Sequence, residues 1–199
     1  MTLRLKSPAK INLFLNVLKK RPDGYHEIET LFERISLRDE IVLSSIKSGI
    51  QIRSDSRQIP KGPGNIAYRA AKLLKDTFHV RTGIAIKIRK KIPVSAGLGG
   101  GSSNAATVLL GLNRLWKLRL SRRKLLRLAA RLGSDVPFFI LEMPFALGRG
   151  RGGILKKISA PRVKLWHVVV KPPFGISTKK AYEALSGLRR PTPALTRSI

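Results

Sequence analysis

The feature that most constrains this chain is a glycine-rich turn, Gly97-Leu-Gly-Gly-Gly-Ser-Ser103, between an expected strand and an expected helix. Isoleucines alternate with charged residues along 84–92, which predicts a half-buried strand, and the apolar stretch 104–118 predicts a helix. A helix N-terminus presents unpaired N–H groups, and glycines let the backbone approach a ligand closely. The turn therefore indicates a phosphate-binding site, with a flexible turn that merely caps the helix as the alternative.

Three common types of phosphate loop do not fit this turn. The Walker pattern requires a Lys followed by Ser or Thr after its last glycine, and neither residue pair is present. The dinucleotide fingerprint requires glycine where this chain has Ser102, and no βαβ unit is evident after it. The protein-kinase loop requires catalytic and metal-binding signatures that the sequence lacks. The turn belongs to another class of phosphate site.

The remaining elements predict an α+β fold, because strands and helices are partly segregated along the chain. Residues 10–18 alternate as a strand, with Ile11, Leu13, Leu15 and Val17 expected on one face and Lys10, Asn12, Phe14 and Asn16 on the other. Further strands are expected at 28–37, 40–46, 50–53 and 165–171. One helix is expected after the N-cap residue Asn65, and another is expected to start at Ser121, with an arginine-rich outer face.

Composition limits the possible classes of protein. The 199 residues, 43% of them hydrophobic, predict one large or two small folded domains. The chain has no cysteine, which excludes disulfides, thiolate metal sites and cysteine nucleophiles. No apolar stretch approaches the roughly 20 residues of a membrane-spanning helix, and no leader is evident, so we expect a cytoplasmic protein. The three histidines lie far apart, and no protein metal site is expected.

The charge is strongly basic, with 40 Lys and Arg against 11 Asp and Glu and a formal net charge of +29. The excess is concentrated in the second half, where Asp135 and Glu142 are the only acidic residues between 113 and 166. Such a balance favours anionic partners. A solvated basic surface is the alternative that we prefer to dedicated nucleic-acid binding, since aromatic residues make up only 6% of the chain.

Two segments contain polar residues that suit phosphoryl chemistry. Lys10 and Asn12 share one expected strand face, so their polar groups can meet one ligand, although an edge-strand lysine in solvent is the simpler interpretation. Asp135 follows the end of a helix within basic surroundings, which suits a proton acceptor, although an N-cap on a turn is the simpler interpretation.

An aromatic pair follows the turn signal Pro22-Asp-Gly24. Tyr25 offers a stacking surface, and His26 offers a ring that forms hydrogen bonds. Partial burial in the core is the alternative for both side chains.

Taken together, these segments resemble the GHMP small-molecule kinases, a family that includes galactokinase, homoserine kinase and mevalonate kinase. The resemblance is carried by Pro93-x-x-x-Gly-Leu-Gly-Gly-Gly-Ser-Ser-Asn-Ala-Ala106, and by Leu132-Gly-Ser-Asp-Val-Pro137. Pro8-Ala-Lys-Ile-Asn-Leu-Phe-Leu15, Arg21-Pro-Asp-Gly-Tyr-His26, Thr30-Leu-Phe32 and Gly175-Ile-Ser-Thr178 are similar to the branch of the family that phosphorylates the 2-hydroxyl of a CDP-linked methylerythritol with ATP and Mg²⁺. The resemblance covers about residues 7–185.

The resemblance implies a role for each matching residue. Lys10 and Asp135 would be the catalytic pair, Asn12 would support the acceptor, and Tyr25 and His26 would hold the cytosine. The residues expected to bind the ATP phosphates are Pro93, Val94, Ser95, Ala96, Gly97, Leu98, Gly99, Gly100, Gly101, Ser102 and Ser103.

The resemblance also implies a GHMP-kinase fold, with a ribosomal-protein-S5-like α/β domain at the N-terminus. We expect this ATP-binding domain to span residues 1–158 and residues 159–199 to begin a truncated C-terminal domain, because the family's second glycine-rich motif is missing. Where the family reads Gly-Arg-Gly-Glu, this chain has Gly150-Arg-Gly-Gly153. Two alternatives to the kinase stay open: a nucleotide-binding homologue without turnover, and a basic RNA-binding protein.

Overall fold

The computed structural model describes residues 1–159, 165–172 and 184. The chain divides into two compact units, Met1–Val169 and Val170–Ile199. All the strands and helices given below belong to the first unit. The expected boundary at residue 158 stays a prediction, and the expected motif Gly175–Thr178 lies outside the described residues.

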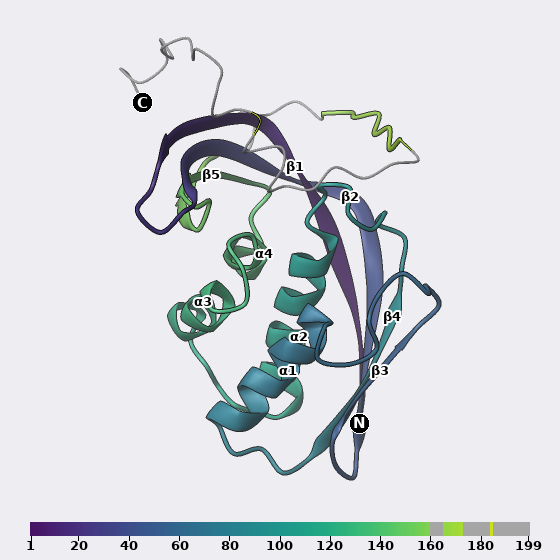
Figure 1. Ribbon diagram of the computed structural model, residues 1–199. Coiled ribbons are helices and arrows are strands. Elements are labelled where there is room, and N and C mark those ends of the chain that lie inside the picture. Colours follow the sequence, from purple (N-terminus) through teal and green to yellow (C-terminus); the bar gives the residue numbers. More distant parts are fainter. Residues whose placement is uncertain (160–164, 173–183, 185–199) are drawn as a thin grey trace. The chain divides into compact units, whose positions relative to one another are not determined.

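A mixed sheet of six strands, counted over the described residues, forms one layer of the first unit (Figure 1). Its path is β3-β4-β2-β5-β6, and β1 pairs with β2 beside this path. The bounds are Thr2–Lys20 for β1, His26–Ile46 for β2, Ile50–Ser54 for β3, Gly83–Arg89 for β4, Phe145–Gly150 for β5 and Ile154–Lys157 for β6. The β3–β4 pair is parallel and the other pairs are antiparallel.

Helices pack against one face of this sheet (Figure 1). They are α1 at Ile66–Thr77, α2 at Gly100–Leu115, α3 at Arg122–Ala130 and α4 at Val136–Leu141. Ile84, Ile86 and Ile88 of β4 are fully buried beneath them, as their alternation predicted. The expected N-cap Asn65 is confirmed, because it accepts a hydrogen bond from Ala67 N. Ser121, where the next helix was expected to start, caps α3 by accepting a hydrogen bond from Lys124 N.

The two longest strands differ most from the sequence-based expectation. Residues 28–37 and 40–46 form one strand, β2, whose early part pairs with β5 and whose late part pairs with β4. The register of β1 shifts between Asn12 and Phe14, which disrupts the expected alternation. Leu13, Phe14 and Leu15 are all about 40% exposed, so the expected difference between the face of Leu13 and Leu15 and the face of Phe14 is not seen in their burial.

Other elements were misplaced or missed. Helix α2 begins at Gly100 and not at residue 104, so two loop glycines form its first turn. Residues 165–171 form no strand, although their composition suggested one. The sequence offered no clear periodicity for α4, β5 or β6, which are only four to six residues long. None of the described helices combines the length and apolar character needed to cross a membrane.

Candidate active site

The glycine-rich turn lines an open cavity of about 360 Å³ at the N-terminus of α2. Residues 93–102 form most of its wall, together with Lys90, Asn65 and Asn104 among others. The backbone reaches the helix through left-handed conformations at Ser95, Gly97 and Gly99. Gly99 is the N-cap, and no side chain caps the helix. The first-turn N–H groups are therefore not satisfied by a capping side chain, which is the arrangement that an anion requires.

Gly99 also brings the loop against the first strand. A Cβ at this position would lie 3.0 Å from Lys10 Cγ and 3.0 Å from Phe139 Cζ. The backbone φ of Gly99, +67°, also disfavours residues other than glycine. The backbone N–H of Lys10 donates to the carbonyl oxygen of Leu98 at 3.0 Å. The glycine-rich turn is thus packed directly on Lys10.

Lys10 connects this loop to the other predicted catalytic residue. Its side chain is buried, with 6% exposure, so the solvent-exposed alternative for this lysine is wrong. The ammonium lies 3.7 Å from Asp135 Oδ2 and donates to Asn12 Oδ1 at 2.6 Å. Asn12 Nδ2 in turn donates to Thr30 Oγ1, whose hydroxyl donates to Phe14 O. The structure brings Lys10, Asn12 and Asp135 together from separate parts of the sequence.

Asp135 occupies the N-cap position of α4, but its side chain makes no capping hydrogen bond. The carboxylate is about one-third exposed and faces Lys10. The capping interpretation therefore describes the position of Asp135 and not the contacts of its side chain. The observed contact of the carboxylate is with the Lys10 ammonium, which itself lies beside the loop.

Tyr25 and His26 lie at the tip of the β1–β2 hairpin. Tyr25 is 52% exposed, so core burial does not describe it, whereas His26 is half-buried at the start of β2. The guanidinium of Arg151 covers the Tyr25 ring, 3.5 Å from its centroid. Arg21 organises the turn through ion pairs with Glu27 and Asp23, and these hydrogen bonds raise the pKa of Arg21 above its ordinary value. The ring contact of Tyr25 is therefore with Arg151, and not with Lys10 or Asp135.

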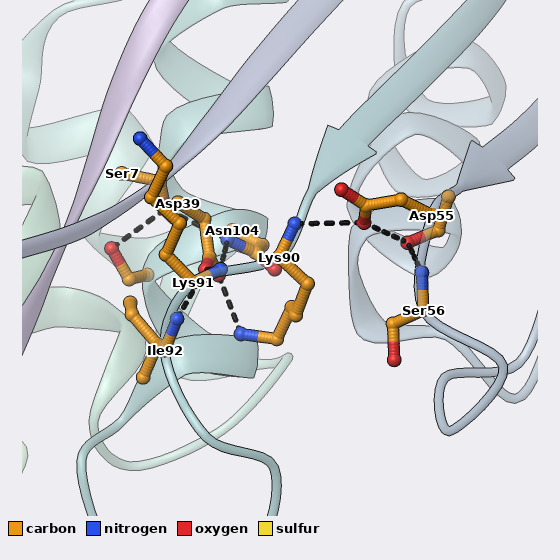
Figure 2. Close-up of polar contacts among 10 residues, drawn as sticks. Ser7, Asp39, Asp55, Ser56, Lys90, Lys91, Ile92 and Asn104 are labelled. Atoms are coloured by element: carbon orange, nitrogen blue, oxygen red, sulfur yellow. Dashed lines mark hydrogen bonds and ion pairs between the residues drawn. The ribbon is translucent and has the colours of Figure 1, made fainter.

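A buried polar cluster beneath the loop was not predicted, and we call its members Ser7, Asp39, Lys90, Ser103 and Asn104 the loop-base cluster (Figure 2). The Ser103 hydroxyl lies 2.8 Å from Ser7 Oγ and is fully buried, so it is directed into this cluster and not into the cavity. The burial of Lys90 had a signal in the sequence, because the alternation along 84–92 places Lys90 on the same face as the buried isoleucines. Asp39 carried no such signal, because it fell in an expected gap between two strands.

Known proteins similar to the chain identify its family. Residues 65–143 match the family described as "GHMP kinases N terminal domain". A Bacillus pumilus protein named 4-diphosphocytidyl-2-C-methyl-D-erythritol kinase is 46% identical over 200 residues, covering 100% of this chain and 68% of that protein. The chain belongs to the 4-diphosphocytidyl-2-C-methyl-D-erythritol kinase family.

Other members of the 4-diphosphocytidyl-2-C-methyl-D-erythritol kinase family are similarly related. The Geobacillus kaustophilus enzyme is 50% identical over 187 residues, or 93% of this chain, and the chain spans 64% of that relative's length. A crystal structure titled 4-(cytidine 5'-diphospho)-2C-methyl-D-erythritol kinase aligns with a TM-score of 0.70 and 44% identity, over 80% of this chain and 56% of that one. The expected α+β class and GHMP-kinase fold are confirmed.

Proposed function

We propose that the chain binds ATP with its phosphates in the loop Pro93–Ser103 and transfers the γ-phosphoryl group to the 2-hydroxyl of 4-diphosphocytidyl-2-C-methyl-D-erythritol. The observation that carries this proposal is the position of Lys10, whose backbone bonds to the phosphate loop while its ammonium faces Asp135. Relatives that bear the name of this kinase support the choice of acceptor. The kinase is therefore favoured over the RNA-binding alternative, and ATP as the donor favours a cytoplasmic location.

Each residue near Lys10 has a proposed task in the transfer. Asp135 would orient the acceptor hydroxyl and take its proton, because a carboxylate beside the acceptor suits general base catalysis. Lys10 would hold the Asp135 carboxylate in place and offset the negative charge of the moving phosphoryl group. Asn12, fixed by Thr30, would keep the Lys10 ammonium directed toward this point. Positioning and electrostatics supply most of the catalysis in phosphoryl transfer.

The exposed aromatic residue would bind the nucleotide part of the acceptor. Tyr25 would stack on the cytosine, and His26 would form hydrogen bonds with it. Arg151 covers one face of the Tyr25 ring, so the cytosine would stack on the other face, and the guanidinium would be available to a phosphate oxygen. The hairpin tip thus offers both an aromatic surface and a positive charge.

The residues present fit a Mg²⁺ ion carried in with ATP. Among the described residues, no group of three or more His, Cys, Asp or Glu could hold a metal by itself. Mg²⁺ in phosphoryl-transfer sites is usually held by substrate phosphates, water and one or two carboxylates. Asp135 would offer a carboxylate to such an ion, which would neutralise charge on the phosphates.

A coupled assay of ADP release by the purified chain tests the proposal. The chain is incubated with ATP and Mg²⁺ alone, with the CDP-linked methylerythritol, and with mevalonate or homoserine as acceptors. We expect ADP release that depends on the CDP-linked acceptor and is far slower with the others. ATP binding without acceptor-dependent ADP release would favour the nucleotide-binding homologue without turnover.

A further inference from the structure

Asp39 is a fully buried carboxylate in the interior of β2, directly beneath the phosphate loop (Figure 2). Its Oδ1 accepts hydrogen bonds from the backbone N–H groups of Lys91 and Ile92, each at 2.8 Å. Its Oδ2 accepts from Lys90 Nζ at 2.6 Å and from Asn104 Nδ2 at 2.9 Å. Four donors therefore converge on one carboxylate.

These donors come from the two ends of the loop. Residues 90–92 lead from β4 into the loop, and Asn104 lies in the first turns of α2, which leaves it. The carboxylate thus joins the chain entering the loop to the helix that follows it. Asn104 also donates to Ser7 Oγ at 2.9 Å, which ties the start of α2 to β1.

The same carboxylate fixes a cation at the edge of the cavity. The Lys90 side chain is almost fully buried, its residue lines the cavity, and its Nζ would lie 3.0 Å from a Cβ at Gly100. A buried lysine requires a partner, and Asp39 is that partner. With the ion pair formed, the ammonium is held beside the first turn of α2.

Asp39 itself is not part of the cavity wall. A buried ion pair adds little net stability to the folded state, because a well-packed apolar pair in its place is often equally stable. Here, however, every donor that contacts the carboxylate belongs to a segment that shapes the phosphate site. The placement points to a role in ligand binding that is exerted through other residues.

We propose that Asp39 is the positioning residue of the phosphate loop: it holds the loop's two ends together and orients the Lys90 ammonium, without touching the nucleotide. The inference rests on the proposed function, since it assumes that the loop binds ATP. Its specific consequence is that loss of the carboxylate weakens nucleotide binding and leaves binding of the hydroxyl acceptor unchanged.

Calorimetric titration of the whole chain with AMP-PNP, and separately with the CDP-linked acceptor, tests the inference. For Asp39→Asn we expect AMP-PNP to bind about tenfold or more weakly, because charged hydrogen bonds to a buried group are lost. The acceptor should bind within about twofold of the wild-type affinity. Asp55→Asn is the matched control, because Asp55 also accepts a hydrogen bond from Lys90, through the backbone N–H at 2.9 Å, but is exposed.

A second variant keeps the test decisive if Asp39→Asn does not fold. Asn104→Ala removes one link to Asp39 while all charges remain, and we expect AMP-PNP to bind several-fold more weakly. A folded Asp39→Asn variant, or failing that a folded Asn104→Ala variant, that binds AMP-PNP as the wild type does would overturn the inference. A wild-type chain that binds no AMP-PNP would instead contradict the proposed function.

Discussion

The two ends of the candidate active site are built in opposite ways. At the phosphate end, the loop rests on buried polar residues, Asp39, Asn104 and Ser103, and Gly99 leaves no space beside Lys10. At the acceptor end, the β1–β2 hairpin presents exposed apolar side chains, Leu13, Phe14 and Leu15, and an exposed Tyr25. Packing and hydrogen bonds within the protein hold the phosphate end in place, whereas the proposed acceptor end leaves apolar side chains exposed to solvent.

This difference suggests that the two ends tolerate change differently. Substitutions at the phosphate end alter packed or hydrogen-bonded groups, so they should affect folding and nucleotide binding together. Substitutions at the hairpin tip remove exposed groups, so they should affect acceptor binding while stability is preserved. For the proposed catalytic pair, Lys10 beside the loop and Asp135 facing it, we expect the largest effect on turnover and little effect on binding.

Asp135→Asn is expected to have the largest effect. The amide keeps the shape of the side chain but cannot take a proton, so kcat should fall by about 10²–10⁴. The melting temperature should fall modestly, because the buried Lys10 loses its anionic partner but still donates to Asn12 Oδ1. Steady-state kinetics beside a thermal melt provide the measurement, and a variant that retains wild-type kcat would remove Asp135 from the mechanism.

Gly99→Ala tests how closely the phosphate end is packed against Lys10 and Phe139. The new methyl group adds a clash with Lys10 and Phe139 to an unfavourable positive φ, so the free energy of unfolding should fall by about 2–5 kcal/mol. Gly97→Ala is the control, since Gly97 has a φ of +71° but open space around its Cβ position. It should lose only about 1–2 kcal/mol in chemical denaturation. Equal losses in the two variants would show that close packing on Lys10 is unimportant.

Tyr25→Ala tests the acceptor end. Loss of a stacking surface should raise the KM for the CDP-linked acceptor about tenfold. The KM for ATP and the melting temperature should stay close to wild type, because the side chain is exposed. Tyr25→Phe retains the ring and should retain the affinity. If Tyr25→Ala binds the acceptor normally, stacking on this residue does not contribute.

Asp55→Asn should have the smallest effect, visible only in the pH dependence of stability. The hydrogen bond from the Lys90 backbone N–H is the main cause that lowers the pKa of Asp55. A lowered pKa in the folded state stabilises the protein above the unfolded-state value of about 3.9, and this contribution is lost as the pH falls further. Melting curves of wild type and variant should therefore differ slightly at neutral pH and converge at strongly acidic pH. A difference that grows on acidification would contradict this origin.

The sequence predicted the local features well and the long-range ones poorly. The isoleucines of β4, the N-cap at Asn65 and the helix start at Ser121 were predicted correctly, because each depends on neighbours along the chain. The similar exposure of Leu13, Phe14 and Leu15 was missed, because a register shift between paired strands leaves no mark on one strand's alternation.

The site shows the same division. Lys10, Asn12 and Asp135 were expected from their motifs, and the structure adds that they meet. Asp39 could not be found in this way, since its partners lie more than 50 residues away in sequence. A buried carboxylate is recognisable only once the fold has placed its donors around it.

Phosphorus NMR of the purified chain with ATP, Mg²⁺ and the CDP-linked methylerythritol tests the central claim most directly. A phosphoryl group that passes from ATP to the acceptor hydroxyl should produce ADP and one new phosphomonoester signal in equal amounts. ATP that remains intact, or that yields ADP and inorganic phosphate with no phosphomonoester, would contradict the account.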